Sequence, residues 1–583
     1  MTLAPLHRIV ALCQTSSVAL AHTLAAALAL CACDPALFGA GTEAGAGAFS
    51  DPVGGDLFGE PEPVPTGTAN PAASACGAVP VAGRCKDDKT IERCLVVTGV
   101  GDPQVTTSSC GKFESCTQDK GKAVCMQHAG KCDPGASLCK DGKTLRQCAD
   151  DGAWNEFVCD NGCKQTAAGA GCSPAGTVGY KVRVTYQFRG PNEALTDWSN
   201  QTTLAPVAGL LGLSLRKDGD GYTTVDAAST DAQGWLDIQI ASDTGQAPLI
   251  LLIAGKVGAD GNTLDYVIAR PDVGDGEQDV DLSAAAVDKA KLWTWTVDPG
   301  ELDSGTTVTV TEAQNSGVLR VFDYLRYIHG QANTILAGLT LPLVVWMRPN
   351  TSWNCGACFS DTPVTVLGFE LWAQAWLPMT AEDTSFWADP VTGHEFGHWV
   401  MAGFSTSPRE GGPHCLGVPT LPGQAWSEGF ATAFSSLMRN DPRYYDKQDG
   451  SFFWLDIAKR KYPNKAWSLP KASLGLIQMH DENDVAAIVW ALAGQPGIGK
   501  QNALFAVSST RLQVDAAKRG YTRHTWGVAK CKKKDIVNTG DPAPFLADYL
   551  DALVCEGAPG SSIDAVTLPA TQFPFPSTSP VCD

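Results

Sequence analysis

Apolar and polar residues alternate most clearly between about residues 177 and 314. In the stretch YKVRVTYQF (180–188), Val182, Val184, Tyr186 and Phe188 fall on one face of an extended chain. Turn sequences such as KDGDG, TDAQG and GADGN separate further runs of this kind, among them LLGLSLRK, GWLDIQI, APLILLIA, LDYVIARP and TTVTVTEA. Several short strands at this spacing predict an antiparallel β-sandwich over residues 175–314.

Helical spacing of apolar residues begins at residue 316. The segment GVLRVFDYLRYIH (317–329) predicts a helix because its apolar residues form one stripe, namely Val318, Val321, Phe322, Leu325 and Ile328. Strands are expected in LPLVVWM, NCGACFS and TVLGFELWA, and HDENDVAAIVWALAG (480–494) is typical of an N-capped helix. Residues 315–583 are therefore expected to form an α+β domain with a helical C-terminal part.

The first 74 residues carry targeting and tether signals. A weakly basic start precedes an apolar run that is too short for a membrane span, which predicts a signal peptide over residues 1–32. The run ends in LCAC, which resembles the lipobox of bacterial lipoproteins. Cys33 follows the small residue Ala32 and is a better lipid acceptor than Cys31, which follows Leu30. Residues 33–74 are rich in Gly, Ala, Pro and acidic residues and predict a flexible tether.

Lipidation of Cys33 would anchor the chain on a membrane. We therefore expect a secreted protein that is lipid-anchored at the bacterial cell envelope, at the outer membrane or cell surface; plain secretion with a nearby cleavage is the alternative. Of the 21 cysteines, Cys13 and Cys31 would leave with the signal and Cys33 would carry lipid, so an even 18 remain. An even number is typical of an oxidising compartment.

Twelve cysteines between residues 76 and 172 form two units of six, predicted over 75–126 and 127–174. Both units contain one phrase, CKDDKTIERC in the first and CKDGKTLRQC in the second, so they are an internal repeat. Each unit is too small to fold on apolar burial alone and is expected to need about three disulfides. A zinc site is disfavoured here because these cysteines form no CxxC pairs. A spacer or interaction role is the simplest function for the repeats.

The net charge of the chain limits the classes of partner that it can bind. A formal net charge of −19 argues against nucleic acid, or an anionic membrane surface, as a partner held by electrostatics.

The stretch DPVTGHEFGHWVMAGF (389–404) contains the residues that indicate a catalytic site. Asp389 is expected to cap a helix here, with Pro390 in its first turn and Gly403 near its end.

Two histidines one helical turn apart predict a metal site. His394 and His398 project from the same helix face, and their imidazoles can reach one zinc ion at about 2.0–2.1 Å. Glu395 lies off that face, so it can address a water molecule without becoming a ligand. A catalytic zinc takes three protein ligands. A third histidine does not follow at the required spacing, and Glu428 in AWSEGFATAFSSLM (425–438) is the better third ligand.

HEFGH followed by WSEGFAT resembles the gluzincins, which are zinc peptidases with two histidines and a glutamate as ligands. The second phrase is similar to a motif of the aminopeptidase N family and, in part, to fungalysin. The resemblance implies a zincin-like metallopeptidase domain, Zn²⁺ bound by His394, His398 and Glu428, and Glu395 as the general base. It covers roughly residues 316–500.

The chain departs from that family in several places. Residues 399–427 place 29 residues between His398 and Glu428, more than is usual in thermolysin and the aminopeptidases. Thr432 stands where thermolysin-like enzymes have an Asp that orients a ligand histidine. The insert carries Cys415, which could bond to Cys355 or Cys358. No motif places the electrophilic residue of the family; Tyr444, Tyr445 and His480 are the candidates.

These features predict an extracellular zinc metallopeptidase that hydrolyses a protein or peptide substrate. Zinc would polarise the carbonyl and lower the pKa of its water, and Glu395 would transfer the proton. One alternative is a surface adhesion or scaffold lipoprotein with a vestigial peptidase domain. Another is a zinc-free chain in which His394 and His398 are ordinary helix residues.

Overall fold

The computed structural model describes residues 84–582 except 96–103, 111–113, 120–121, 128–130, 133–135, 150, 161, 167–168, 173–175, 219–220, 243–247, 259–262, 337–340, 409–413, 415–419, 463–464, 467–480, 514–543, 572–576 and 581. The predicted signal peptide, Cys33 and the tether lie outside the described residues. Two compact units are present, and the boundary between them falls at residues 175 and 176.

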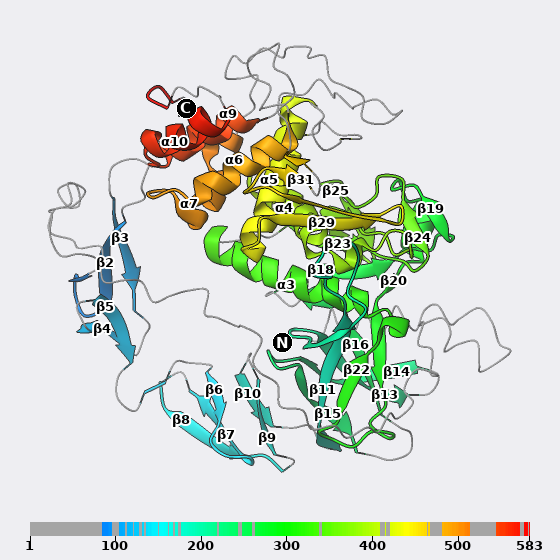
Figure 1. Ribbon diagram of the computed structural model, residues 1–583. Helices are drawn as coiled ribbons and strands as arrows, with labels where there is room; N and C mark the ends of the chain where they lie inside the picture. Colours follow the sequence, from blue (N-terminus) through cyan, green and yellow to red (C-terminus); the bar gives the residue numbers. More distant parts are fainter. Residues whose placement is uncertain are drawn as a thin grey trace. The chain divides into compact units, whose positions relative to one another are not determined.

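The first unit contains the two cysteine-rich repeats, each built from short antiparallel strands (Figure 1). The first repeat comprises β1 (Arg84–Cys85), β2 (Thr90–Leu95), β3 (Gln104–Ser109), β4 (Glu114–Asp119) and β5 (Lys122–Gln127). The second repeat comprises β6 (Ser137–Cys139), β7 (Thr144–Cys148), β8 (Trp154–Val158), β9 (Cys163–Thr166) and β10 (Gly169–Cys172). The shared phrase forms the same hairpin in both, β1–β2 and β6–β7.

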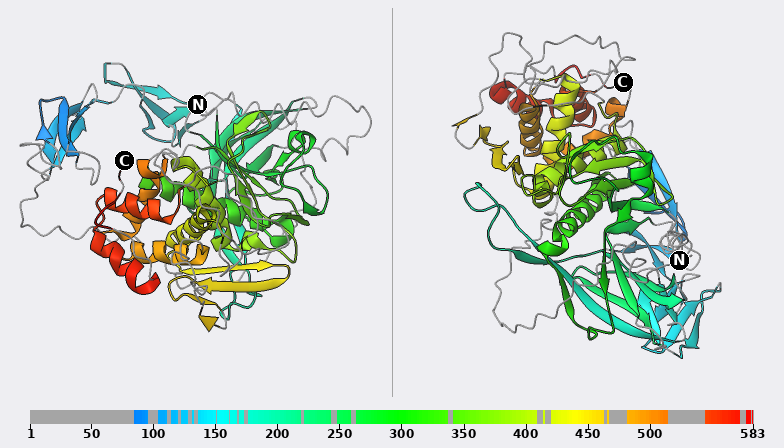
Figure 2. Two further views of the ribbon diagram at one scale, coloured as in Figure 1. Left: turned by 90° about the horizontal axis from the view of Figure 1, so that it is seen from above. Right: turned by 90° about the vertical axis from the view of Figure 1, so that its right-hand side faces the viewer.

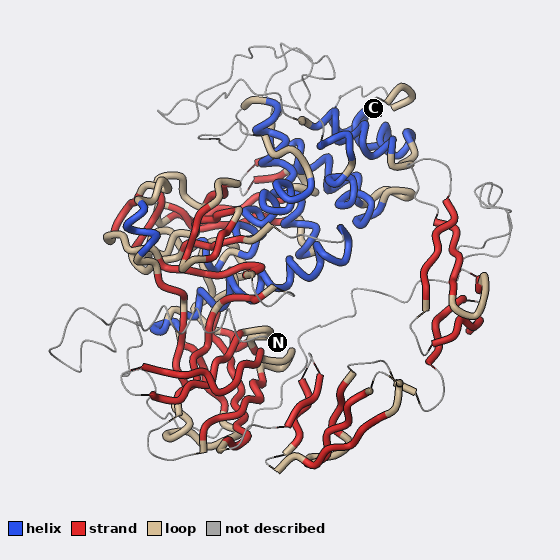
Figure 3. The backbone as a smooth tube through the Cα atoms, turned by 180° about the vertical axis from the view of Figure 1, so that it is seen from behind, coloured by secondary structure: helices blue, strands red, loops and turns tan. Residues whose placement is uncertain are grey.

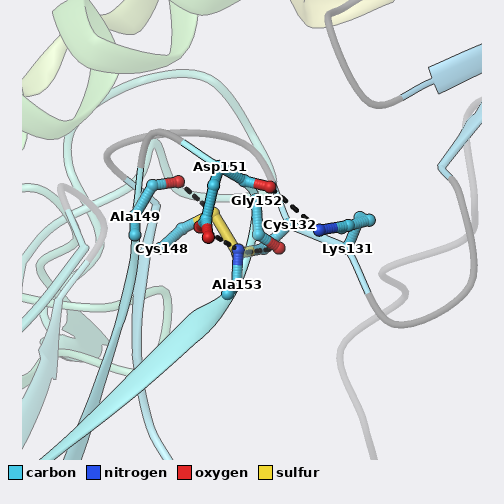
Figure 4. The surroundings of a disulfide bond; sticks show 7 residues. All are labelled: Lys131, Cys132, Cys148, Ala149, Asp151, Gly152 and Ala153. Atoms are coloured by element: carbon cyan, nitrogen blue, oxygen red, sulfur yellow. Dashed lines mark hydrogen bonds between the residues drawn. A yellow bond between two sulfur atoms is a disulfide. The ribbon is translucent and has the colours of Figure 1, made fainter.

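Disulfides hold these small sheets together, as predicted. The second repeat is closed by Cys132–Cys148, Cys139–Cys163 and Cys159–Cys172, and the first repeat has Cys85–Cys116 at the position equivalent to Cys139–Cys163. Figure 4 shows the Cys132–Cys148 bond, beside which the Lys131 ammonium donates to the carbonyl oxygen of Asp151 over 2.9 Å. The bonds replace the apolar core that units of this size cannot build.

The second unit begins with two four-stranded sheets. One contains β11 (Thr177–Phe188), β12 (Thr203–Pro206), β15 (Trp235–Ala241) and β22 (Thr307–Val310). The other contains β13 (Leu211–Asp218), β14 (Gly221–Ser229), β16 (Leu249–Ile253) and β21 (Thr294–Val297). Most pairs are antiparallel, but β22 runs parallel to β11. The sheets face each other where the side chain of Leu236 packs directly over Gly212.

A third sheet combines strands from both sides of residue 314. Its order is β17 (Gly255–Val257), β18 (Leu264–Arg270), β23 (Leu343–Trp346), β28 (Ala373–Trp376) and β25 (Cys358–Ser360), with β20 (Lys291–Leu292) paired to β18. Strands β18, β23 and β28 are parallel, and β25 is an antiparallel edge strand. Two small strand pairs flank it, β19 (Gly276–Gln278) with β24 (Thr351–Trp353) and β26 (Val364–Val366) with β27 (Phe369–Leu371).

Helices dominate the rest of the second unit (Figure 3). The long helix α3 (Ser316–Leu336) buries the whole predicted apolar stripe. The other helices are α2 (Ala284–Asp288), α4 (Asp389–Phe404), α5 (Pro422–Arg439), α6 (Glu482–Ala493), α7 (Gly499–Phe505), α8 (Thr510–Gln513), α9 (Leu546–Cys555) and α10 (Gly560–Thr571). The hairpin of β29 (Arg443–Gln448) and β30 (Ser451–Asp456), extended by β31 (Lys461–Tyr462) and β32 (Lys465–Ala466), follows α5, and β29 lies against α4 (Figure 2).

The protein is thus multidomain, with antiparallel sheets, several disulfides and a helical region late in the chain. Further disulfides join Cys355 to Cys358 and Cys555 to Cys582. Multiple disulfides indicate an extracellular or otherwise oxidising environment. Over the described part of the chain, no helix combines the length and apolarity needed to cross a membrane.

Candidate metal centre

Helix α4 carries the first two predicted ligands and is tied to α3 at its start. Pro390 lies in the first turn, as predicted. The predicted cap is wrong: Ala388 is the N-cap residue, and the carboxylate of Asp389 accepts two hydrogen bonds from the guanidinium of Arg320 on α3. Gly403 does not end the helix, which continues to Phe404. Because the carboxylate is engaged in this charge-assisted pair, it does not cap the helix.

Small residues let α4, α5 and α6 approach closely. A Cβ atom on Gly397 would lie 2.7 Å from the Cα atom of Ala431, so α4 meets α5 backbone to backbone at the residue before His398. A Cβ atom on Gly429 would lie 2.5 Å from the Cβ atom of Val485, so α6 packs directly behind the residue after Glu428. Because glycine has no side chain, both crossings bring the functional side chains of α4 and α5 together.

The three predicted ligands meet between α4 and α5 in spite of the long insert. His394 Nε2 lies 3.0 Å from Glu428 Oε2, His398 Nε2 lies 3.2 Å from the same oxygen, and the two Nε2 atoms are 3.1 Å apart. His394 and His398 are each 8% exposed, so little water reaches them. These three residues form a group that could hold a metal ion.

The opposite side of each imidazole is held by a hydroxyl group on α5. His394 Nδ1 lies 3.0 Å from Thr432 Oγ1, and His398 Nδ1 lies 3.1 Å from Ser427 Oγ. With each Nδ1–H donating to its hydroxyl oxygen, both Nε2 atoms present a lone pair toward Glu428. Thr432 thus contacts His394, one of the candidate ligands. Thermolysin-like enzymes have an Asp at the position of Thr432.

The arrangement fits a tetrahedral metal ion. Ligand atoms at about 2.0–2.1 Å from zinc are about 3.3 Å from one another in a tetrahedron. The observed separations of 3.0–3.2 Å are close to that value. With the histidines in this tautomer, two lone pairs and a carboxylate oxygen converge, which favours a cation at their centre. Three protein ligands leave one position for water or substrate.

Electrostatics separate the roles of the two glutamates. Burial raises the pKa of Glu395, which is 4% exposed, and the neighbouring histidines only partly offset this. Burial also acts on Glu428, but nearby positive charge, first of all that of His414, outweighs it and holds the pKa of Glu428 well below its usual range. Glu428 is therefore the permanent anion of the pair, whereas Glu395 is suited to exchanging a proton.

Of the three candidates for a further polar group, the structure brings Tyr444 to the cluster. Its ring centroid lies 6.1 Å from that of His394. Burial raises the pKa of Tyr444 well above its usual value, and the negative charges of Asp446 and Glu395 raise it further. Tyr445 points to the other side of β29, where its ring packs on Trp198 and Phe452. His480 lies outside the described residues.

His414 was missed from the sequence. Its Nδ1 atom lies 2.6 Å from Glu482 Oε2 at the start of α6, and its Nε2 atom lies 3.6 Å from Glu428 Oε2. It belongs to the insert between the ligand helices, where no local pattern indicates a partner. The only signal was the presence of a histidine in the segment that separates two ligands.

The edge strand β25 runs beside the cluster. The ring of Phe359 stacks on that of His398, with centroids 6.1 Å apart and planes inclined by 22°. The expected bond from Cys415 to this strand is wrong, because Cys355 and Cys358 pair with each other. Cys415 itself lies outside the described residues. The chain matches no family model, and no curated protein matches its sequence.

Proposed function

We propose that this protein is an extracellular zinc metallopeptidase. The observation that carries the proposal is the convergence of His394 Nε2, His398 Nε2 and Glu428 Oε2 within 3.2 Å of one another, with both Nδ1 atoms held from behind. Two imidazoles and one carboxylate are the ligand set of the gluzincins, which HEFGH and WSEGFAT resemble. The proposed domain is zincin-like, and it would follow a β-sandwich in the chain.

Zinc, when bound, would polarise the scissile carbonyl and lower the pKa of a water molecule. Glu395 follows His394 in the chain and is not one of the three converging groups, and burial raises the pKa of its carboxyl, which makes the ionised carboxylate a stronger base. It would accept a proton from the attacking water and deliver it to the leaving amine. Tyr444 would donate a hydrogen bond to the oxyanion that develops on the carbonyl.

A peptide is the substrate class that the surroundings favour. Strand β25 lies at the edge of its sheet and, among the described strands, pairs only with β28. Its outer backbone groups could therefore pair with an extended peptide next to His398. The disulfides support an extracellular or otherwise oxidising environment for the proposed reaction, and a lipid on Cys33 would hold the enzyme at the cell envelope.

The test is proteolysis of an unbiased peptide pool by the wild-type protein and by Glu395→Gln, with the zinc content of both measured. The expected result is one zinc per chain in both proteins and cleavage by the wild type alone. Absence of zinc from the wild type would overturn the metal site. Bound zinc without cleavage of any peptide would favour the scaffold alternative, in which the domain is vestigial.

A further inference from the structure

Three basic side chains lie side by side at one end of the third sheet. Arg270 ends β18 and stands directly opposite Lys291 of β20 in the antiparallel pair. Arg348 follows β23, whose last residue pairs with Ala269 of β18. Like charges directly opposite each other across a pair of strands are destabilising. Three positive side chains grouped in this way, in a chain with a net charge of −19, therefore need a functional explanation.

The local carboxylates neutralise this group only in part. Arg348 donates to Asp275 over 2.6 Å and to the carbonyl oxygen of Gly274 over 2.8 Å. Among the described residues, however, neither Arg270 nor Lys291 forms an ion pair. The guanidinium of Arg270 lies over the ring of Trp293, 5.5 Å from its centroid, so it is held in place without an anion.

These side chains line a cavity of about 290 Å³. Four positive residues line it, Arg270, Lys289, Lys291 and Arg348, and two negative ones, Asp272 and Asp275. The lining therefore has a surplus of two positive charges. The cavity shares no residue with the metal centre. Burial and the charge of Arg348 both lower the pKa of Arg270, which agrees with an uncompensated positive field.

We propose that this cavity binds a doubly charged oxyanion, a phosphate or sulfate group, with Arg270, Lys291 and Arg348 as its principal partners. Two guanidinium groups can each make paired hydrogen bonds to such an anion, and two surplus positive charges match its charge. The cavity has room for more than the anion itself, so the group would be carried by a small organic molecule. This site does not depend on the proposed peptidase activity.

The test is isothermal titration of the full-length secreted protein with inorganic phosphate and, separately, with sulfate, at constant ionic strength. Acetate and chloride serve as monovalent controls. Metal-stripped protein is titrated in parallel, so that anion binding at the metal centre is distinguished. The variants are Arg270→Gln and Lys291→Gln, and Lys217→Gln is the matched control because it removes one exposed positive charge from β13.

Saturable binding of phosphate or sulfate by wild type and Lys217→Gln is expected, with affinity reduced about tenfold or more in each pocket variant, since a charge-assisted contact is lost. The anion that binds more tightly identifies the group. Without ligand, Arg270→Gln should not lower the melting temperature, because it relieves repulsion. Equal responses to all four anions, or unchanged affinity in both pocket variants, would overturn the site.

Discussion

His414 connects the candidate ligand Glu428 on α5 to Glu482 at the start of α6, with its two ring nitrogens 3.6 Å and 2.6 Å from the respective carboxylate oxygens. His414, from the segment between α4 and α5, thus lies beside the candidate metal centre. A carboxylate that is held from outside loses less entropy when it binds a metal, and outer partners of this kind orient ligands in metal sites. We interpret His414 as a positioning residue for Glu428.

The first prediction follows from this link. His414→Ala should weaken zinc binding about tenfold, because the partner that orients Glu428 is lost, and Glu482→Gln should act in the same direction. Competition with a chromophoric chelator measures the affinity. If His414 acts through Glu482, the double variant will lose less than the sum of the single variants. Additive losses would show that the two residues act separately.

The second prediction concerns the hydroxyl groups behind the histidines. Thr432→Val and Ser427→Ala should each lower zinc affinity about 10–100-fold, because the imidazoles lose the partners that fix their orientation. Ser436→Ala is the control on the same helix, since its buried hydroxyl has no hydrogen-bond partner in the described structure. Competition with a chelator measures the zinc affinity of all three variants. Equal affinities in the three proteins would contradict the orientation argument.

The third prediction tests the close helix crossing. Gly397→Ala places a methyl group 2.7 Å from the Cα atom of Ala431, so the helices must separate. We expect a loss of about 1–3 kcal/mol in the free energy of unfolding, together with weaker zinc binding. Gly330→Ala on α3 is the matched control, because nothing lies within 4 Å of the added atom, and it should stabilise by about 0.5–1 kcal/mol. Urea unfolding measures the free energy of unfolding of both variants.

The fourth prediction separates two neighbouring tyrosines. Tyr444→Phe should reduce kcat for peptide cleavage by about 10²–10³-fold with little change in KM, since one donor to the developing oxyanion is lost. Tyr445→Phe should retain activity, because this ring packs in the aromatic cluster with Trp198 and Phe452. Steady-state kinetics on one cleaved peptide compare them. Equal losses in the two variants would point to a structural role for the strand instead.

The fifth prediction is a pH dependence of stability. Burial and, to a lesser extent, the negative charge of Asp383 raise the pKa of Asp446 to about 7; both carboxylates accept from the Ser385 hydroxyl. The folded state therefore keeps a proton that the unfolded state, with a pKa of 3.8, releases. The stabilisation is present below about pH 4 and is lost as the pH rises to about 7, by at most about 1.4 kcal/mol per pH unit.

Asp446→Asn, which stays neutral at every pH, should flatten this slope. Thermal unfolding of wild type and variant between pH 4 and 8 measures it. The same slope in both proteins would assign the effect to other groups, of which Asp383, with a pKa raised by burial to about 6, is the nearest.

Local patterns along the chain were sufficient for the elements and for part of the site. Period-two and helical spacing predicted β11, β13, α3 and α6 because side-chain direction depends only on neighbouring residues. The i, i+4 spacing of His394 and His398 likewise places both rings on one face of α4. The repeated cysteine phrase indicated the disulfide-bonded hairpins, although not the pairing of Cys132 with Cys148.

Tertiary structure alone decided the contacts that join distant segments. Thr432 and Ser427 reach the imidazoles only because Gly397 lets α5 cross α4 closely, and the approach of His414 to Glu428 follows no local spacing. The opposition of Arg270 and Lys291 depends on strand register, which the sequence of neither strand contains. Spacing along a helix or strand is local geometry, whereas meeting across elements is set by packing of the whole chain.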